Sequence, residues 1–274
     1  MLQLLKDRVV LKLSGADRIK FLQGVITKNC SNLTVNIFFY SLMLTPQGKY
    51  LYDFFIVNSD NSVYFDIAEE LCDEFVKRIN IYKLRSDIAI DLCPELSVAV
   101  TETTGAMDEE FLFASEDPRS DKIGTRIIAN QEVINKLITA DHNFYHTSRI
   151  KNLIPEGFYD MIQNSSFPLE YGFDHIGAID FDKGCYVGQE VITRTHFRGT
   201  IRKKLFLLIS ENPFPKKGEE IFFQNKRIGI TASSSGNMGL ALLRIEDVLD
   251  NKINSLIINN LEYRIISGNN VNYT

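Results

Sequence analysis

The chain has 274 residues, of which 45% are hydrophobic and 24% charged, so it can bury a sizeable core and has room for about two domains. Its formal net charge of −5 argues against direct nucleic-acid binding by the whole chain, because that function needs a positive field. Its apolar runs are too short to span a bilayer, which excludes a transmembrane helix and argues against a membrane role.

Patterned sequence begins almost at Met1, without a signal peptide or an arginine-rich transit segment. We therefore expect a cytoplasmic protein, with a mature chain that has lost its presequence as the alternative. The cysteines Cys30, Cys72, Cys93 and Cys185 lie far apart and form no C-x-x-C or zinc-type pair. We expect reduced thiols and assign the first three to the core.

Strands and helices alternate irregularly in the first part of the chain. Val9, Leu11 and Leu13 alternate with polar or smaller residues, which predicts a half-buried strand, and Gly15 precedes a helix up to Val25. Such an irregular order predicts an α+β fold rather than a doubly wound parallel sheet. Further strands are predicted over 38–45, 50–57, 63–65, 88–92, 96–100, 111–114 and 123–129, and helices over 68–81, 131–138 and 143–150.

After Gly199 the pattern changes to short strands separated by polar turns. Many short strands of this kind predict a small barrel. We place the domain boundary near Gly199, which gives a domain over 1–199 and a C-terminal β-barrel over 200–274. The predicted strands cover 204–209, 220–223, 227–231, 238–243, 255–258 and 261–266.

The stretch 182–190, D-K-G-C-Y-V-G-Q-E, crowds small, charged and reactive groups together. Gly184 and Cys185 predict the turn into a helix that runs to Arg198. A thiol at a helix N-terminus faces unpaired N–H groups, which favours the thiolate, and Lys183 adds a second positive charge. The pattern indicates a reactive or metal-binding Cys185. The alternative is a small buried residue in a tight contact between helix and loop.

The predicted helix has two relevant faces. Cys185 and His196 share one stripe, but a rise of 1.5 Å per residue separates them by roughly 16 Å, so they cannot form a dyad or share a metal. Glu190, Arg194 and Arg198 form a second stripe, typical of a solvated face with salt bridges.

Two other sequence patterns that would indicate a metal or phosphate site are missing. His142 and His146 are four residues apart on a predicted helix, but no Glu follows His142, so the zinc-protease pattern is missing and we expect no metal site there. No glycine loop that could cradle a phosphate occurs.

The sequence K-G-C-Y-V-G-Q-E over 183–190 resembles the signature of the folate-binding YgfZ family. Members of that family resemble the glycine-cleavage T-protein, an aminomethyltransferase, and act in iron–sulfur cluster assembly. The similarity extends over 167–170, 177–182, Arg194, His196, 198–199 and 201–205, and more weakly over most of the chain. It is greatest to the branch of the mitochondrial iron–sulfur assembly factor and its bacterial relatives.

This resemblance implies a fold of two ferredoxin-like units, the T-protein-like folate-binding fold, followed by a small C-terminal β-barrel. It implies that Cys185 is a transient iron–sulfur cluster ligand or a redox thiol, with Lys183 favouring the thiolate. The rest of the motif, which includes Tyr186, is expected to shape the loop. Gly184 and Gly188 would permit a close approach of the backbone. Gln189 and Glu190 would hold the loop in place.

The resemblance also implies tetrahydrofolate contacts. Glu170 matches the Glu of a Leu-Glu pair that binds the pteridine ring, and a carboxylate can accept two hydrogen bonds from that ring. Its alternative is a surface or capping residue. Tyr145 falls where relatives place an aromatic residue near the folate, or packs in the core. Arg149 would pair with the folate tail or with Glu156.

Aminomethyltransferases carry an acidic pair where this chain has Tyr52 and Asp53. One carboxylate of the pair is missing, which argues against aminomethyl transfer. Asp53 is a predicted folate contact, with a solvent-facing strand residue as the alternative.

A basic segment lies over 191–210, which contains no acidic residue. It could meet a folate polyglutamate tail, an acidic partner or RNA, or be a solvated edge between helix and barrel. Its basic side chains are Arg194, Arg198, Arg202, Lys203 and Lys204, together with His196.

The resemblance thus implies a folate-binding accessory factor, not a conventional enzyme, for assembly or repair of iron–sulfur clusters, chiefly the four-iron kind. Its partners would be iron–sulfur assembly proteins and cluster-containing clients, with indirect effects on tRNA modification. One alternative is an enzyme that transfers a one-carbon unit from a folate to an amine, supported by Glu170 and Asp53. Another is a scaffold whose basic segment docks partners.

Overall fold

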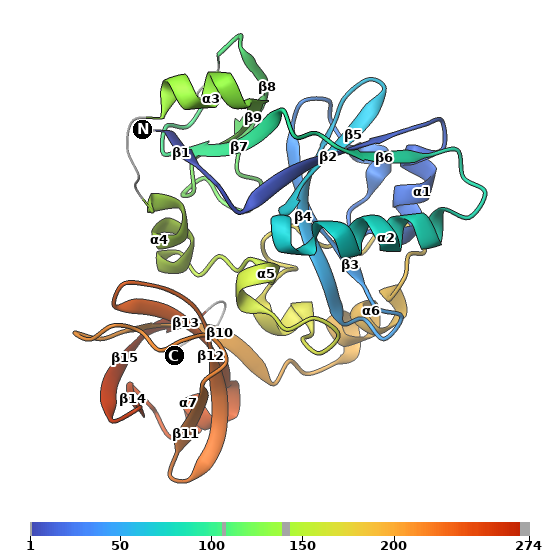
Figure 1. Cartoon of the computed structure of the whole chain (residues 1–274). Coiled ribbons are helices and arrows are strands. Elements are labelled where there is room, and N and C mark those ends of the chain that lie inside the picture. The colour runs from blue at the N-terminus through green and yellow to red at the C-terminus, as the bar shows by residue number, and fades with distance from the viewer. Residues whose placement is uncertain (1, 106–107, 139–142, 269–274) are drawn as a thin grey trace.

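The computed structural model describes residues 2–105, 108–138 and 143–268. It has three antiparallel sheets, of five, four and six strands, each in its own region of the molecule (Figure 1). Helices and irregular segments from 144 to 202 fill the space where the three regions meet. Within the described residues, no helix is both long enough and apolar enough to cross a bilayer.

The five-stranded sheet has the order β3-β4-β5-β2-β6. Its strands are β2 (Arg8–Ser14), β3 (Phe38–Leu44), β4 (Tyr50–Asn58), β5 (Ser62–Ala68) and β6 (Ala89–Leu92). Helices α1 (Arg18–Val25) and α2 (Cys72–Lys83) cover one face, with the short 3-10 helices η1 (Cys30–Asn32) and η2 (Glu69–Leu71) beside them.

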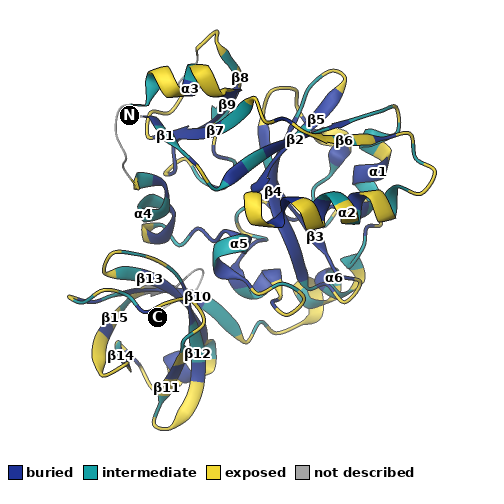
Figure 2. Cartoon of the chain, viewed as in Figure 1, coloured by how far each residue is buried: buried dark blue, intermediate teal, exposed yellow. Residues whose placement is uncertain are grey.

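Strand β4 is buried on both faces, as Figure 2 shows. Its side chains alternate between two cores, because successive residues of a strand point to opposite faces. Phe54 and Ile56 pack in the core beneath α1 and α2. Phe55 and Val57 pack in the central core, which the sheet shares with the rest of the chain. The strand therefore carries residues from the outer helices to the centre of the molecule.

The four-stranded sheet has the order β1-β7-β9-β8. Its strands are β1 (Leu2–Leu4), β7 (Leu96–Thr101), β8 (Phe111–Glu116) and β9 (Thr125–Asn130). Helix α3 (Gln131–Leu137) follows β9 directly and packs on the sheet through Ile134, against Ile127 and Ala129.

The C-terminal region is a six-stranded sheet of order β11-β12-β13-β10-β15-β14. The two end strands, β11 and β14, also lie against each other, so the sheet is nearly closed into a barrel. Helix α7 (Ile245–Asp250) follows β13. The strands are β10 (Lys203–Ile209), β11 (Glu220–Phe223), β12 (Lys226–Ser235), β13 (Met238–Arg244), β14 (Ser255–Ile258) and β15 (Leu261–Gly268).

The central core joins all three regions. It contains Tyr145 and Ile150 of helix α4 (Phe144–Lys151), Tyr171 of the 3-10 helix η3 (Pro168–Tyr171) and barrel residues such as Leu205 and Leu242. Helix α5 (Gly157–Asp160) and helix α6 (Gln189–Arg198) flank it.

The predicted α+β class with a C-terminal β-barrel is confirmed. One element is corrected: Gly184 and Cys185 were expected to form the turn into a helix, but the helix starts only at Gln189. Gly188, its N-cap, has a φ of +85°, so the helical backbone does not extend back to the signature cysteine three residues earlier.

Candidate functional site

The signature loop, residues 177–188, packs against the turn between β3 and β4. A Cβ atom on Gly188 would lie 2.5 Å from the carbonyl oxygen of Thr45, and one on Gly48 would lie 3.0 Å from the Cβ of Val191. Both glycines have positive φ. At Gly184, by contrast, no described atom would lie within 4 Å of a Cβ. The close approach expected of both motif glycines therefore occurs only at Gly188.

Cys185 lies in this loop, outside helix α6, so the prediction that its thiol caps a helix is wrong. The thiol is nevertheless accessible. All four cysteines of the sequence lie in described residues and are free, but only Cys185 is exposed. Cys30, Cys72 and Cys93 are buried, which confirms their assignment to the core.

Lys183 turns into the protein. Its ammonium donates hydrogen bonds of 2.7 Å to the carbonyl oxygens of both Ile26 and Lys28, and the residue is 5% exposed. Burial lowers the pKa of Lys183 to about 8, against the opposing charges of Cys30 and Asp180. Burial raises the pKa of the nearby thiol of Cys30 to about 12, although the Lys183 ammonium lowers that pKa.

Gln189 and Glu190 were expected to hold the loop, and only the first does. The Gln189 amide donates to the carbonyl of Lys183 at 3.3 Å. Glu190 points outward and pairs with Arg194 at 3.9 Å, as the helix spacing predicted for a solvated face. Tyr186 is buried, and its ring lies 4.9 Å from the Lys183 ammonium.

Helix α6 presents a mixed basic and aromatic face beside the loop. Its exposed Phe197, Arg194 and Arg198 line a shallow groove. His196 stacks on Phe181 of the signature loop, with ring centroids 3.8 Å apart. Its Nδ1 atom also lies 3.5 Å from a carboxylate oxygen of Asp174.

Asp53 is 1% exposed, so the alternative of a solvent-facing residue is wrong. Its carboxylate accepts hydrogen bonds from the hydroxyls of Tyr40 and Tyr50 and from the backbone N–H of Gly157. Burial raises the pKa of Asp53.

Tyr145 is also 1% exposed, consistent with its core alternative. Its hydroxyl accepts hydrogen bonds from Arg119 and Arg126 and donates to Glu156. Arg149 is 1% exposed, and its guanidinium donates to Asp160 at 2.9 Å and to Nδ1 of His146 at 3.1 Å. Among the described residues it forms no hydrogen bond or ion pair with Glu156.

These residues belong to a buried charged cluster that sequence reasoning missed. Arg8 of β2 donates to Asp66 of β5 and to Glu156, and Arg126 of β9 also donates to Asp66. Burial alone would raise the pKa of Glu156, but the surrounding guanidinium groups, led by that of Arg8, hold it well below its usual range. The cluster thus joins the two sheets and the linker before α5. A possible signal was a charged residue inside an apolar strand, as in the V-Y-F-D-I-A of β5.

Glu170 stands apart from that cluster. It lies on η3, and its carboxylate is 3.8 Å from the Lys203 ammonium of β10. Burial raises its pKa, against the charge of Lys203. Within the described residues, no hydrogen bond or ion pair joins Glu170 to Asp53, Tyr145 or Arg149.

Among the described residues, no group of three or more His, Cys, Asp or Glu side chains could hold a metal ion. His142 lies outside the described residues. His146 is held by Arg149, and burial lowers its pKa to about 4.

Known proteins resemble this chain over most of its length. The family model of the CAF17 C-terminal β-barrel domain matches residues 202–265. The iron–sulfur cluster assembly factor IBA57 homolog, mitochondrial, of Pyricularia oryzae is 30% identical over 281 residues, which cover 90% of this chain and 72% of that protein. Its human counterpart, IBA57, is 29% identical over 276 residues, covering 89% and 77%.

The homolog of Dictyostelium discoideum is 30% identical over 250 residues, covering 75% of this chain and 61% of that protein. The chain thus spans less than two thirds of that relative's length, and 52% of the Neurospora crassa relative's.

A solved structure shows the same fold. The glycine cleavage system aminomethyltransferase T from Bartonella henselae superposes with a TM-score of 0.74 over 97% of this chain and 84% of that one, at 11% identity. The predicted T-protein-like fold is therefore confirmed.

The expected cytoplasmic location is wrong, because these assembly-factor relatives are mitochondrial by name. That expectation depended on a missing targeting pattern alone. The resemblance is otherwise confirmed at the level of the branch that contains the mitochondrial assembly factor. The chain belongs to the IBA57 family of iron–sulfur cluster assembly factors.

Proposed function

We propose that this protein is an accessory factor in iron–sulfur cluster assembly, and that Cys185 supplies a thiolate ligand to a cluster held with a partner. The observation that carries the proposal is the exposure of Cys185, in contrast to the three buried cysteines. A cluster ligand must be both deprotonated and reachable, and a buried thiol is neither. In this proposal the cluster is cargo, which the protein helps to transfer or repair.

The packing of the signature loop supports this role. Gly188 lies against the β3–β4 turn, and Lys183 fixes the other side of the cysteine to the backbone of residues 26 and 28. A thiol on a loop fixed at both sides loses little conformational freedom when it binds a ligand. Lys183 would therefore act by positioning the loop.

The partners would be iron–sulfur assembly proteins and cluster-containing clients. The groove on α6, with exposed Phe197 between Arg194 and Arg198, offers an aromatic anchor and two guanidinium groups. Aromatic residues and arginines are enriched at protein interfaces. We propose an acidic partner surface for this groove.

Tetrahydrofolate binding is the finer part of the proposal. Glu170 fits a pteridine ring, because its carboxylate is partly exposed and its one ion-pair partner in the described structure, Lys203, is 3.8 Å away. Asp53, Tyr145 and Arg149 do not fit, because their polar atoms are bound within the protein. We therefore propose Glu170 alone of the four as a direct contact, as in the YgfZ type of protein. Bound folate would supply a one-carbon carrier.

The geometry does not favour one-carbon transfer as the main activity. Such a reaction needs an acid or base that reaches the substrate, and Asp53 is enclosed by two tyrosines and Gly157. Effects on tRNA modification would follow indirectly, through tRNA-modifying enzymes that carry clusters.

The proposal is tested by reconstituting a cluster anaerobically with a cluster-carrying assembly protein and this chain, and recording visible absorption of the purified complex. Cys185→Ser should abolish the absorption that wild type retains. Cys72→Ser removes a thiol elsewhere and should retain it, since Cys72 is buried on α2. Equal absorption with Cys185→Ser would contradict the proposal.

A further inference from the structure

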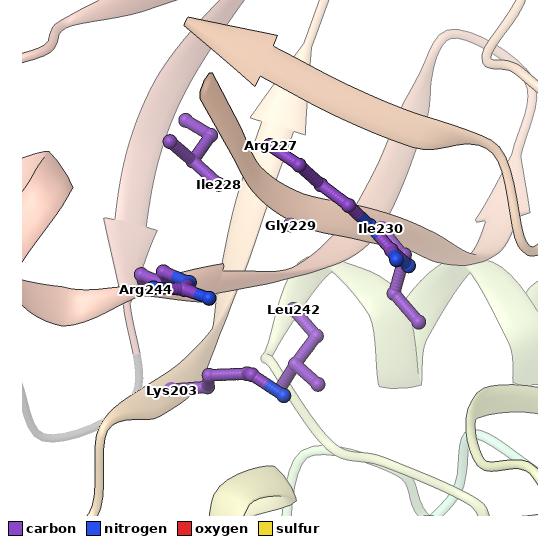
Figure 3. Close-up of a pocket in the computed structure, with 7 residues that line it drawn as sticks. All are labelled: Lys203, Arg227, Ile228, Gly229, Ile230, Leu242 and Arg244. Carbon is purple, nitrogen blue, oxygen red and sulfur yellow. The ribbon is translucent and has the colours of Figure 1, made fainter.

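A small cavity opens on the barrel between β10, β12 and β13 (Figure 3). Its volume is about 180 Å³. Pockets for whole small molecules usually measure roughly 300–1,000 Å³, so this cavity suits one chemical group of a ligand. Its lining is Lys203, Arg227, Ile228, Gly229, Ile230, Leu242 and Arg244.

The cavity has a surplus of positive charge. Its lining contains three cationic side chains and no carboxylate. Two of them have partners outside the lining: Arg227 pairs with Glu220 at 3.0 Å, and Lys203 with Glu170 at 3.8 Å. Arg244 has no ion-pair partner among the described residues. An anion could therefore bind Arg244 without displacing a carboxylate from it.

The backbone shapes this cavity through an irregularity in β12. Ile221 of β11 pairs with Gly229, but the next residue, Phe222, pairs with Arg227, so Ile228 is an extra residue. A bulge of this kind changes the direction of the neighbouring side chains. Gly229 adds to the hollow, because a Cβ there would lie 2.3 Å from the carbonyl oxygen of Leu242.

The lining also has an apolar part. Ile230 and Leu242 lie beside the cationic groups, as Figure 3 shows. Guanidinium groups bind planar or tetrahedral oxyanions with two parallel hydrogen bonds.

We propose that this cavity is a binding site for one oxyanion group, a carboxylate or a phosphate, of a small ligand. Arg244 is its main contact, and Arg227 and Lys203 complete the positive lining. The inference does not depend on the proposed role of Cys185, because neither that thiol nor a cluster takes part in it. It shares only Lys203 with the proposed folate contact, since Lys203 pairs with Glu170.

The test is calorimetric titration of the full chain at low ionic strength, with inorganic phosphate in one series and γ-glutamyl-glutamate in another. Arg244→Gln should weaken binding roughly tenfold, the scale of one charge-assisted hydrogen-bonded pair. Arg264→Gln is the matched control, since Arg264 is exposed on β15 of the same barrel and does not line the cavity. It should leave the affinity unchanged.

A second pair of variants tests the competing carboxylate. Glu220→Gln releases Arg227 and should tighten binding by roughly twofold to fivefold. Glu262→Gln makes the same change in net charge at an exposed position of β15 and should have no effect. All four substitutions are on exposed side chains, so the variants should fold, as thermal midpoints will verify.

The two ligand series distinguish the source of the group. Binding of phosphate alone supports a phosphate-bearing ligand, and binding of the γ-glutamyl compound alone supports a carboxylate-bearing one. Binding of both supports a general oxyanion site. The proposal is overturned if neither compound binds, or if Arg244→Gln and Arg264→Gln weaken binding equally.

Discussion

A Cβ atom on Gly188 would lie 2.5 Å from the carbonyl oxygen of Thr45. The signature loop and the β3–β4 turn are therefore in contact through backbone, at a place where only glycine fits. This contact fixes the end of the loop that carries Cys185, while the cysteine itself remains exposed. The loop combines a rigid base with an accessible thiol.

Replacement of Gly188 by alanine should destabilise the protein by about 2 kcal/mol or more, because the left-handed backbone and the contact with Thr45 both oppose a side chain. Gly184→Ala is the matched control in the same loop and should change the free energy of unfolding by less than about 0.5 kcal/mol. Urea denaturation measures both. Equal losses would show that the contact seen at Gly188 is not what distinguishes the two glycines.

Lys183 should give a pH-dependent contribution to stability. Burial lowers its pKa from 10.5 to about 8 in the folded state, so between these values the unfolded chain binds more protons than the folded one. Stability from this group therefore rises with pH between about 8 and 10.5. The difference in unfolding free energy between wild type and Lys183→Met, followed over this range, should grow with pH. A constant difference would mean that Lys183 titrates normally.

Substitutions of Tyr145 and Glu170 should have opposite effects: the first should lower stability, and the second should weaken folate binding. Tyr145→Phe removes the hydroxyl that links two arginines to Glu156, and should cost about 1–3 kcal/mol of stability without a specific effect on tetrahydrofolate affinity. Glu170→Gln should weaken tetrahydrofolate binding roughly tenfold to a hundredfold and change stability little. Fluorescence titration and urea denaturation of both variants make the comparison. Tight folate binding by Glu170→Gln would contradict the proposal that Glu170 contacts tetrahydrofolate.

His146 should destabilise the protein as the solution becomes acidic. Its pKa falls from 6.5 to about 4 on folding, through burial first and the neighbouring Arg149 second. As the pH falls from 6.5 to about 4, His146 therefore becomes protonated in the unfolded chain but stays neutral in the folded one. The free energy of unfolding decreases over this range. His146→Asn keeps an acceptor for Arg149 but cannot be protonated, so its stability should fall less. Parallel pH profiles for both proteins would contradict this assignment.

Most strands could be predicted from the sequence, because alternating apolar residues such as Val9, Leu11 and Leu13 indicate the local backbone geometry. The sequence was insufficient for β1, whose three residues are too few for a period and depend on pairing with β7. The start of α6 was misplaced because the left-handed Gly188 leaves no mark in composition.

For the candidate site too, the sequence was sufficient for one part and insufficient for another. The motif identified Cys185 and the loop around it, because those residues are adjacent in the chain. The charged cluster was missed because its partners are distant: Arg8 reaches Glu156 across 148 positions. A charged residue alone predicts exposure, and only its partner explains its burial.

The most direct measurement is the recovery of a four-iron-cluster enzyme's activity in cells that lack this protein. Wild type and the buried-thiol control Cys72→Ser should restore it, and Cys185→Ser, expressed at the same level, should not. Restoration by Cys185→Ser equal to that by wild type would contradict the central claim that the exposed thiol of the signature loop carries the function.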